Sequence, residues 1–211
     1  SDICITSTGN LNYTGGTIKL DGAHPSGSYN VAIGCAAMRD NTVGNSNVGI
    51  GYFALRSNTT GVQNIALGQN ALFGNLTGYC NVAIGYETLQ CNTSGYHNIA
   101  IGNSASKLNN TGIFNIAIGN ESLCTNTTAS FNTAFGSRSL RANTTGGCND
   151  AFGWCALTTN TTGGYNTAMG LWSLKLNTTG CKNAAVGSHS LQSNTTGCFN
   201  VAHGYQSLQA N

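Results

Sequence analysis

The sequence predicts an all-β protein that folds as a β-solenoid, or β-roll, of about eleven coils with two short strands per coil. Three observations predict this fold. A glycine recurs every 17 residues from Gly34 to Gly204, and each one ends a nearly constant phrase such as NVAIG. A 17-residue unit is too short for a helical repeat, and its apolar positions do not follow a 3.6-residue period. The hydrophobic content of 40% is enough for a packed core.

The repeat unit begins at the asparagine four places before this glycine and reads N-V-A-I-G-x-x-A-L-x-x-N-T-T-G-x-x. Positions 1 to 17 denote places in this unit. Residues 30–211 hold ten complete units and one unit of twelve residues. Residues 1–29 depart from the period until Gly27. We therefore divide the chain into 1–29, an expected N-terminal cap or assembly arm, and 30–211, the β-solenoid repeat domain.

The first strand is expected over positions 1–5. Position 5 is glycine in every unit, which fits a bend that needs a positive φ or a close backbone approach. Position 3 is alanine except at Gly49, so another surface should approach closely there. Position 4 is nearly always large and apolar, as at Ile33, Ile84, Phe135 and Met169. We expect position 4 to lie in the core.

A second strand is expected over positions 7–10. Position 9 is leucine in nine of eleven units, with Met38 and Ser106 as exceptions, and it should complete the core with position 4. Positions 6, 7 and 10 vary widely, which indicates the outer surface. Positions 12–15 read NTTG and predict a turn, because Asn, Thr and Gly are turn residues.

Asparagine never varies at positions 1 and 12. Turn asparagines bond nearby backbone, and asparagines stacked coil on coil can form an amide ladder. The structural ladder expected at position 1 consists of Asn30, Asn47, Asn64, Asn81, Asn98, Asn115, Asn132, Asn149, Asn166, Asn183 and Asn200.

Energetics explain the repetition. Ordering a coil costs on the order of 1–2 kcal/mol per residue, whereas its two or three buried aliphatic side chains return roughly 1.5–3 kcal/mol each. One coil alone is therefore unstable, and stacked coils must share ladders and cores. With coils about 4.8 Å apart, eleven of them would make a rod roughly 50 Å long.

Charge and motifs exclude several classes of function. The chain has 8 Lys and Arg, 6 Asp and Glu and a net charge of +2, which argues against nucleic-acid binding. It has no run of eighteen apolar residues, so we expect no membrane insertion. The cysteine and histidine spacing does not fit a metal site. No catalytic triad, carboxylate pair or phosphate loop stands out beyond the repeat, so we expect no enzyme and no cofactor.

The asparagine of position 12 is followed two places later by Thr or Ser in nine consecutive units, which is the N-x-S/T glycosylation pattern. Asn41 breaks the pattern because Val43 follows it. Covalent glycans at these sites would form a sugar stripe along one edge of the rod. The alternative is a stacked hydroxyl row that satisfies the turn backbone. The candidate sites are Asn58, Asn75, Asn92, Asn109, Asn126, Asn143, Asn160, Asn177 and Asn194, with Asn12 and Asn120 outside the row.

Nine cysteines are scattered over the unit, and the odd total leaves at least one thiol free or bridging subunits. Cys181 and Cys198 share position 16 of successive coils, which would place their Cα atoms about 4.8 Å apart, within disulfide range. Several cysteines could instead be small buried apolar residues. The candidate pairs are Cys181 with Cys198, Cys80 with Cys91, and Cys148 with Cys155, whereas Cys4, Cys35 and Cys124 have no evident mate.

The phrases NVAIGYETL and NIAIGNESL resemble the head repeats of trimeric autotransporter adhesins of the YadA type. The phrase NTTGGYNTAMGLWSL is similar to repeats of phage tail fibres and large bacterial surface proteins. The resemblance covers about residues 27–211. It implies a β-roll, often trimeric, that works outside the cell as a stalk or an adhesin.

These observations favour a structural subunit of a fibre, located extracellularly or on a cell or virion surface. Its partners would be copies of itself, in a trimer or in a filament in which the terminal coil docks head-to-tail on another subunit. The alternative is an adhesin or tail-fibre shaft that binds a cell surface. An ice-binding protein is less favoured, because no flat strand carries Thr at alternate positions. The aromatic residues expected to serve the binding alternative are Tyr52, Tyr86, Trp154, Trp172 and Tyr205.

Overall fold

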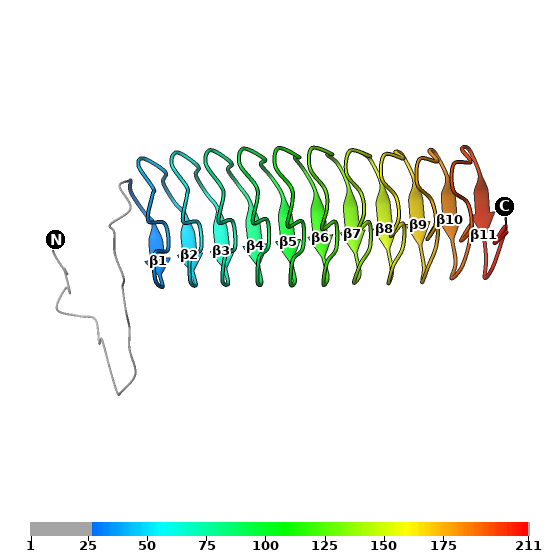
Figure 1. The fold of residues 1–211 in the computed structure, drawn as a ribbon, viewed down its shortest axis with the longest axis horizontal. Coiled ribbons are helices and arrows are strands. Elements are labelled where there is room, and N and C mark those ends of the chain that lie inside the picture. Colours follow the sequence, from blue (N-terminus) through cyan, green and yellow to red (C-terminus); the bar gives the residue numbers. More distant parts are fainter. Residues whose placement is uncertain (1–26, 211) are drawn as a thin grey trace, which may run out of the picture.

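The computed structural model describes residues 27–210, which form a β-solenoid. Each coil contributes one three-residue strand, and the strands stack in sequence order along the rod (Figure 1). The strands are β1 (Val31–Ile33), β2 (Val48–Ile50), β3 (Ile65–Leu67), β4 (Val82–Ile84), β5 (Ile99–Ile101), β6 (Ile116–Ile118), β7 (Thr133–Phe135), β8 (Asp150–Phe152), β9 (Thr167–Met169), β10 (Ala184–Val186) and β11 (Val201–His203).

The strands form one parallel sheet, and each pairs with the strand of the next coil. The register joins residues that are 17 apart, such as Ala134 with Ala151 in β7 and β8. Like residues therefore form columns along the rod, and the predicted all-β solenoid fold is confirmed. Most of the expected cap, residues 1–26, lies outside the described residues.

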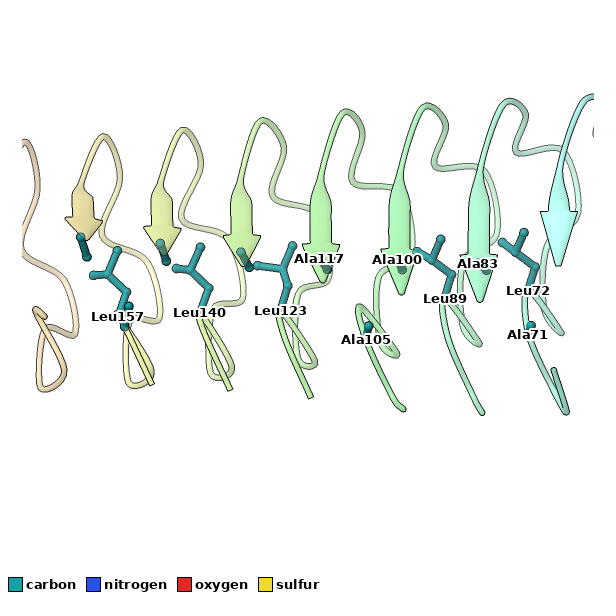
Figure 2. Close-up of a cluster of buried hydrophobic side chains, with 14 of the residues drawn as sticks. Ala71, Leu72, Ala83, Leu89, Ala100, Ala105, Ala117, Leu123, Leu140 and Leu157 are labelled. Carbon is teal, nitrogen blue, oxygen red and sulfur yellow. The ribbon is translucent and has the colours of Figure 1, made fainter. Parts of the chain in front are cut away.

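The core consists of the alanines of position 3, the small residues of position 8 and the leucines of position 9. Figure 2 shows the leucine side chains, among them Leu140 and Leu157, beside the strands and close to the alanine column. The leucines of position 9 are fully buried in coils 2 to 4 and 6 to 10.

The prediction that position 4 lies in the core is wrong. Ile33 and Ile50 are 37% and 38% exposed, and Phe135 is 52% exposed. Successive side chains of a strand point to opposite faces, so positions 2 and 4 face outward when position 3 faces inward. The coil is too narrow to hold a large residue at position 3 opposite the leucine of position 9, which is why alanine is required there.

The second strand, predicted over positions 7–10, does not form. Residues at positions 7 and 9 have positive φ values, as at Glu87 (54°) and Leu89 (47°), and so does position 17, as at His97 (54°). A residue in the left-handed backbone conformation interrupts an extended strand. For residues other than glycine, this conformation costs roughly 1–2 kcal/mol. Hydrogen bonds between coils hold these residues in place, for example from Leu89 N to the Ala105 carbonyl (3.1 Å).

The glycine of position 5 forms the predicted bend. Its φ lies between 119° and 136° in every coil, a region that L side chains rarely adopt. A Cβ atom at Gly136 would also lie 2.6 Å from the carbonyl oxygen of Gly153 in the next coil. Both reasons for an invariant glycine therefore hold at once.

A close approach was predicted at position 3, and at Gly49 a core side chain makes it. A Cβ atom added at Gly49 would lie 3.1 Å from Cε of Met38, the one methionine at position 9. Met38 is longer than the leucine it replaces, and the missing methyl group at Gly49 provides the space. The two exceptions to the repeat thus compensate each other.

Candidate functional site

The position-12 asparagines form a buried column of amide groups at the NTTG turn. In Asn160, Nδ2 donates to Oδ1 of Asn143 in the preceding coil (2.8 Å) and to the carbonyl of Gly163 (2.8 Å). Oδ1 of Asn160 accepts from Nδ2 of Asn177 in the next coil (2.8 Å). The Asn160 side chain is fully buried. The same arrangement recurs from Asn58 to Asn194, with Nδ2–Oδ1 distances of 2.7–3.1 Å.

This geometry is incompatible with N-linked glycans at position 12 of the folded rod. A glycan replaces one N–H of the asparagine amide, and here both N–H groups are already hydrogen-bonded inside the protein. The buried turn also leaves no room for a sugar. The nine candidates concerned are Asn58, Asn75, Asn92, Asn109, Asn126, Asn143, Asn160, Asn177 and Asn194. Of the other two candidates, Asn120 is exposed and Asn12 lies outside the described residues.

The position-1 asparagines form a second hydrogen-bonded column. Oδ1 of Asn132 accepts from both the backbone N (3.0 Å) and Nδ2 (3.2 Å) of Asn149. Nδ2 of Asn149 also donates to the Gly163 carbonyl (2.9 Å), which accepts from Asn160 as well. The two asparagine columns therefore close each coil by meeting at the carbonyl of position 15.

The two hydroxyl residues of the NTTG turn differ in their roles. At position 13, the hydroxyl of Thr161 donates to the carbonyl of Thr178 in the next coil (3.1 Å), and the same bond recurs at Thr59 (2.9 Å to Leu76). At position 14, every side chain from Val43 to Thr196 is exposed. Position 13 is therefore part of the ladder, whereas position 14 forms an outer row.

The outward side chains of positions 2 and 4 make the outer face of the sheet apolar. This sheet face runs over all eleven strands (Figure 1). Its first six strands carry only Val, Ile and Leu outside, and only one acidic residue, Asp150, lies on it. The exposed large apolar side chains of this face are Val31, Ile33, Ile50, Ile65, Ile99, Ile116, Phe135, Phe152, Met169 and Val201.

Aromatic residues of positions 6 and 7 form one strip on coils 8 to 11. Trp154 and Trp172 have ring centroids 5.6 Å apart, Trp172 and His189 are 4.9 Å apart, and His189 and Tyr205 are 5.9 Å apart. The structure thus brings together three of the five predicted aromatic residues. Tyr52 packs instead on Phe53, with centroids 3.8 Å apart. Tyr86 is 44% exposed and lies beside Glu87, whose hydrogen bond raises the pKa of the Tyr86 phenol.

A second aromatic strip was not predicted. Tyr79 stacks on Tyr96 with centroids 4.6 Å apart, and His97, Phe114 and Phe131 stack in turn at 4.9 and 5.5 Å. These residues occupy positions 16 and 17 of coils 3 to 6. The signal was present as aromatic residues recurring at adjacent positions of successive units.

The predicted pair Cys181 and Cys198 is brought together. Their sulfur atoms are 2.8 Å apart, and Sγ of Cys198 also accepts from the Cys181 backbone N (3.0 Å). These hydrogen bonds raise the pKa of Cys181 and lower that of Cys198. Cys181 and Cys198 are nevertheless free thiols in this structure, and so are the other predicted partners that it describes, namely Cys80, Cys91, Cys148 and Cys155.

Ion pairs join neighbouring coils through positions 7 and 10. Nζ of Lys107 lies 2.7 Å from Oε2 of Glu87, and this hydrogen bond lowers the pKa of Glu87. Oε2 of Glu121 is 3.1 Å from Nε of Arg138 and 2.9 Å from Nε of Arg141. These pairs link coils in addition to the backbone ladders.

Residues 27–210 contain no cluster of three or more His, Cys, Asp or Glu side chains that could hold a metal ion. The same part of the chain has no helix that is long and apolar enough to cross a bilayer. The chain matches no family model, no curated protein and no solved structure.

Proposed function

We propose that this chain is a structural subunit of an extracellular fibre, in which copies of the rod associate through the apolar sheet face. The β-solenoid is a structural repeat protein whose ladders run without interruption through the described coils. The observation that carries the proposal is the sheet face itself. An apolar surface of this extent on a soluble protein marks an interaction site.

The size of the sheet face fits a stable interface. Its ten most exposed apolar side chains present on the order of 800 Å², which is close to the area that each partner contributes to a standard interface. Another copy suits this surface because its outward rows repeat at the same coil spacing. Copies can therefore pack with a stagger of several coils, so that each copy contacts two others and the contact continues along a fibre. Two such sheets can pack face to face about 10 Å apart with interdigitated side chains. The resemblance to trimeric adhesins supports the same kind of association among three copies.

The test is to place charge on the sheet face and to measure assembly. We expect the paired substitutions Ile99→Lys and Ile116→Lys to abolish association, because apposed copies would bury unpaired lysines. The control pair is Asn103→Lys and Asn120→Lys, which adds the same charge at exposed position 6 of the same two coils.

Assembly would be followed by sedimentation velocity and electron microscopy, with circular dichroism to confirm folding. The proposal is supported if the wild-type protein and the control variant associate while the sheet-face variant stays monomeric. A wild-type protein that stays monomeric at micromolar concentration, or a face variant that associates like the control, overturns it.

A surface-binding module is the second candidate function. The two stacked aromatic strips favour it, because exposed aromatic rings are enriched at recognition surfaces. Electron microscopy discriminates between the candidates. Long uniform filaments favour the fibre, whereas discrete short particles that lose cell binding on Trp154→Ala favour the binding module.

A further inference from the structure

The outer hydroxyl row of position 14 has a composition that the fold does not explain. All ten side chains of this position are exposed, and nine of them carry a hydroxyl group. The other outward positions, such as 6, 10 and 17, change residue type from coil to coil. The nine hydroxyl residues are Thr60, Thr77, Ser94, Thr111, Thr128, Thr145, Thr162, Thr179 and Thr196.

The turn does not need these hydroxyl groups. Val43 occupies position 14 of the first coil, and its backbone N donates to Thr59 O at 3.1 Å. Thr60, in the next coil, makes the equivalent bond to Leu76 O at the same distance of 3.1 Å. The turn therefore makes the same backbone hydrogen bond with valine as with threonine. Ser94 shows in addition that the β-branched shape of threonine is not what is kept.

The contrast with position 13 strengthens this point. The position-13 hydroxyl donates to the next coil, yet it is replaced by Leu76 and Asn110 in two units. Both units keep a threonine at position 14, namely Thr77 and Thr111. The hydroxyl that stabilises the ladder is thus dispensable, whereas the hydroxyl that points to solvent is kept. Such a pattern indicates a requirement on the outside of the rod.

Covalent glycosylation explains the retained outer hydroxyl groups better than binding to ice or another crystal surface does. The row lies on a turn at the edge of the coil, whereas ice or another crystal surface needs a broad flat face. The chain also carries only 7% charged residues and a long apolar sheet face, so it has few charged groups that would keep the rod in solution. Glycans are bulky and solubilising.

We infer that the position-14 hydroxyls are O-glycosylation sites, which would coat one edge of the rod with sugar. A glycosyltransferase can reach them in the folded protein, which it cannot do for the buried asparagines of position 12. In the reaction, Oγ attacks C1 of a sugar carried on a nucleotide diphosphate or a lipid phosphate. The Oγ–C1 bond forms and the C1–O bond to phosphate breaks. The phosphate leaves with the electron pair, and the enzyme's general base takes the hydroxyl proton. This inference goes beyond the proposed function and does not depend on assembly of the rod.

The test is site-resolved mass spectrometry of the protein from its native source. We expect an intact mass above that of the polypeptide by several sugar residues, unchanged by an amidase that removes N-linked glycans. Mild base should eliminate the sugars. Electron-transfer fragmentation should place them on position 14, with none on the coil that contains Val43.

A matched pair of variants produced in the same cells sharpens the result. Thr145→Val reproduces the natural Val43 turn and should lose one sugar site without loss of stability. Thr144→Val, at position 13 of the same turn, should keep all of them. An unmodified mass overturns the inference, as would sugars found on position 13 or on asparagine. An unmodified protein that inhibits ice growth would instead assign the hydroxyl row to ice binding.

Discussion

Removing one amide from the position-12 column should destabilise the rod strongly. Asn160→Ala deletes three hydrogen bonds of 2.8 Å in a fully buried turn. The Gly163 carbonyl keeps its bond from Asn149, at 2.9 Å. Oδ1 of Asn143 and one N–H of Asn177 are left buried without a partner.

The magnitude follows from those two orphaned groups. A buried polar group that loses its partner costs about 1–3 kcal/mol, so we expect Asn160→Ala to lower the free energy of unfolding by about 2–6 kcal/mol. Because each coil contacts only its neighbours, the effect should be concentrated in the coils on either side. The control is Asn120→Ala, which removes the same group from an exposed site and should change stability by less than about 0.5 kcal/mol.

Urea unfolding followed by circular dichroism measures the free energy, and hydrogen exchange locates the weakened coils. Faster exchange should be seen at the turns of Asn143 and Asn177 first. A loss of less than 1 kcal/mol, or a loss equal to that of Asn120→Ala, would show that the amide column is not what stabilises the turn.

Three further predictions concern residues that depart from the repeat. Ser106→Leu should raise the free energy of unfolding by roughly 1–3 kcal/mol, because it fills the one polar gap in the buried leucine column; unchanged urea midpoints would contradict this. Gly49→Ala should raise the free energy of unfolding by about 0.5–1 kcal/mol when Met38 is replaced by leucine, and should not raise it when Met38 is present. A double-mutant cycle measures this difference, and equal effects in both backgrounds would refute the compensation. The pKa of Glu87 is lowered by Lys107, so its contribution to stability is present above the unfolded carboxyl pKa and is lost as pH falls through the lower folded value. Glu87→Gln should therefore flatten the dependence of unfolding free energy on pH in the acid range, and a profile identical to wild type would exclude this role.

The sequence was sufficient to predict the features that depend on the period. The 17-residue spacing predicted the columns, the leucine core of position 9 and the bend at position 5, because each needs only that coils stack in register. The small residues of position 3 predicted a close approach, although Met38, the residue that approaches Gly49, could not be identified without the radius of the coil.

The errors have two physical causes. The large residues of position 4 were assigned to the core because they are hydrophobic. A three-residue strand, however, has only one inward-facing position, here position 3, and a small residue such as alanine is what fits there opposite the leucine of position 9. The prediction of a second strand was wrong because leucine at position 9 adopts a left-handed backbone conformation. A residue other than glycine gives no sign of that conformation in the sequence. The N-x-S/T pattern did not distinguish a glycosylation site from a structural asparagine, because a buried amide column requires asparagine at the same position.

The irregular residues have a consequence for how this chain finds its native alignment. Coils of identical sequence would fold equally well when displaced by one whole unit, which produces trapped states with a looped-out coil. A displacement of 17 residues would set Met38 against the methyl group of Ala66 instead of Gly49, and Glu87 against Cys124 instead of Lys107. These departures from the repeat make the native register lower in energy than registers that are shifted by one or more whole units. Replacing every unit by the consensus would remove them and leave a chain with many nearly equivalent alignments.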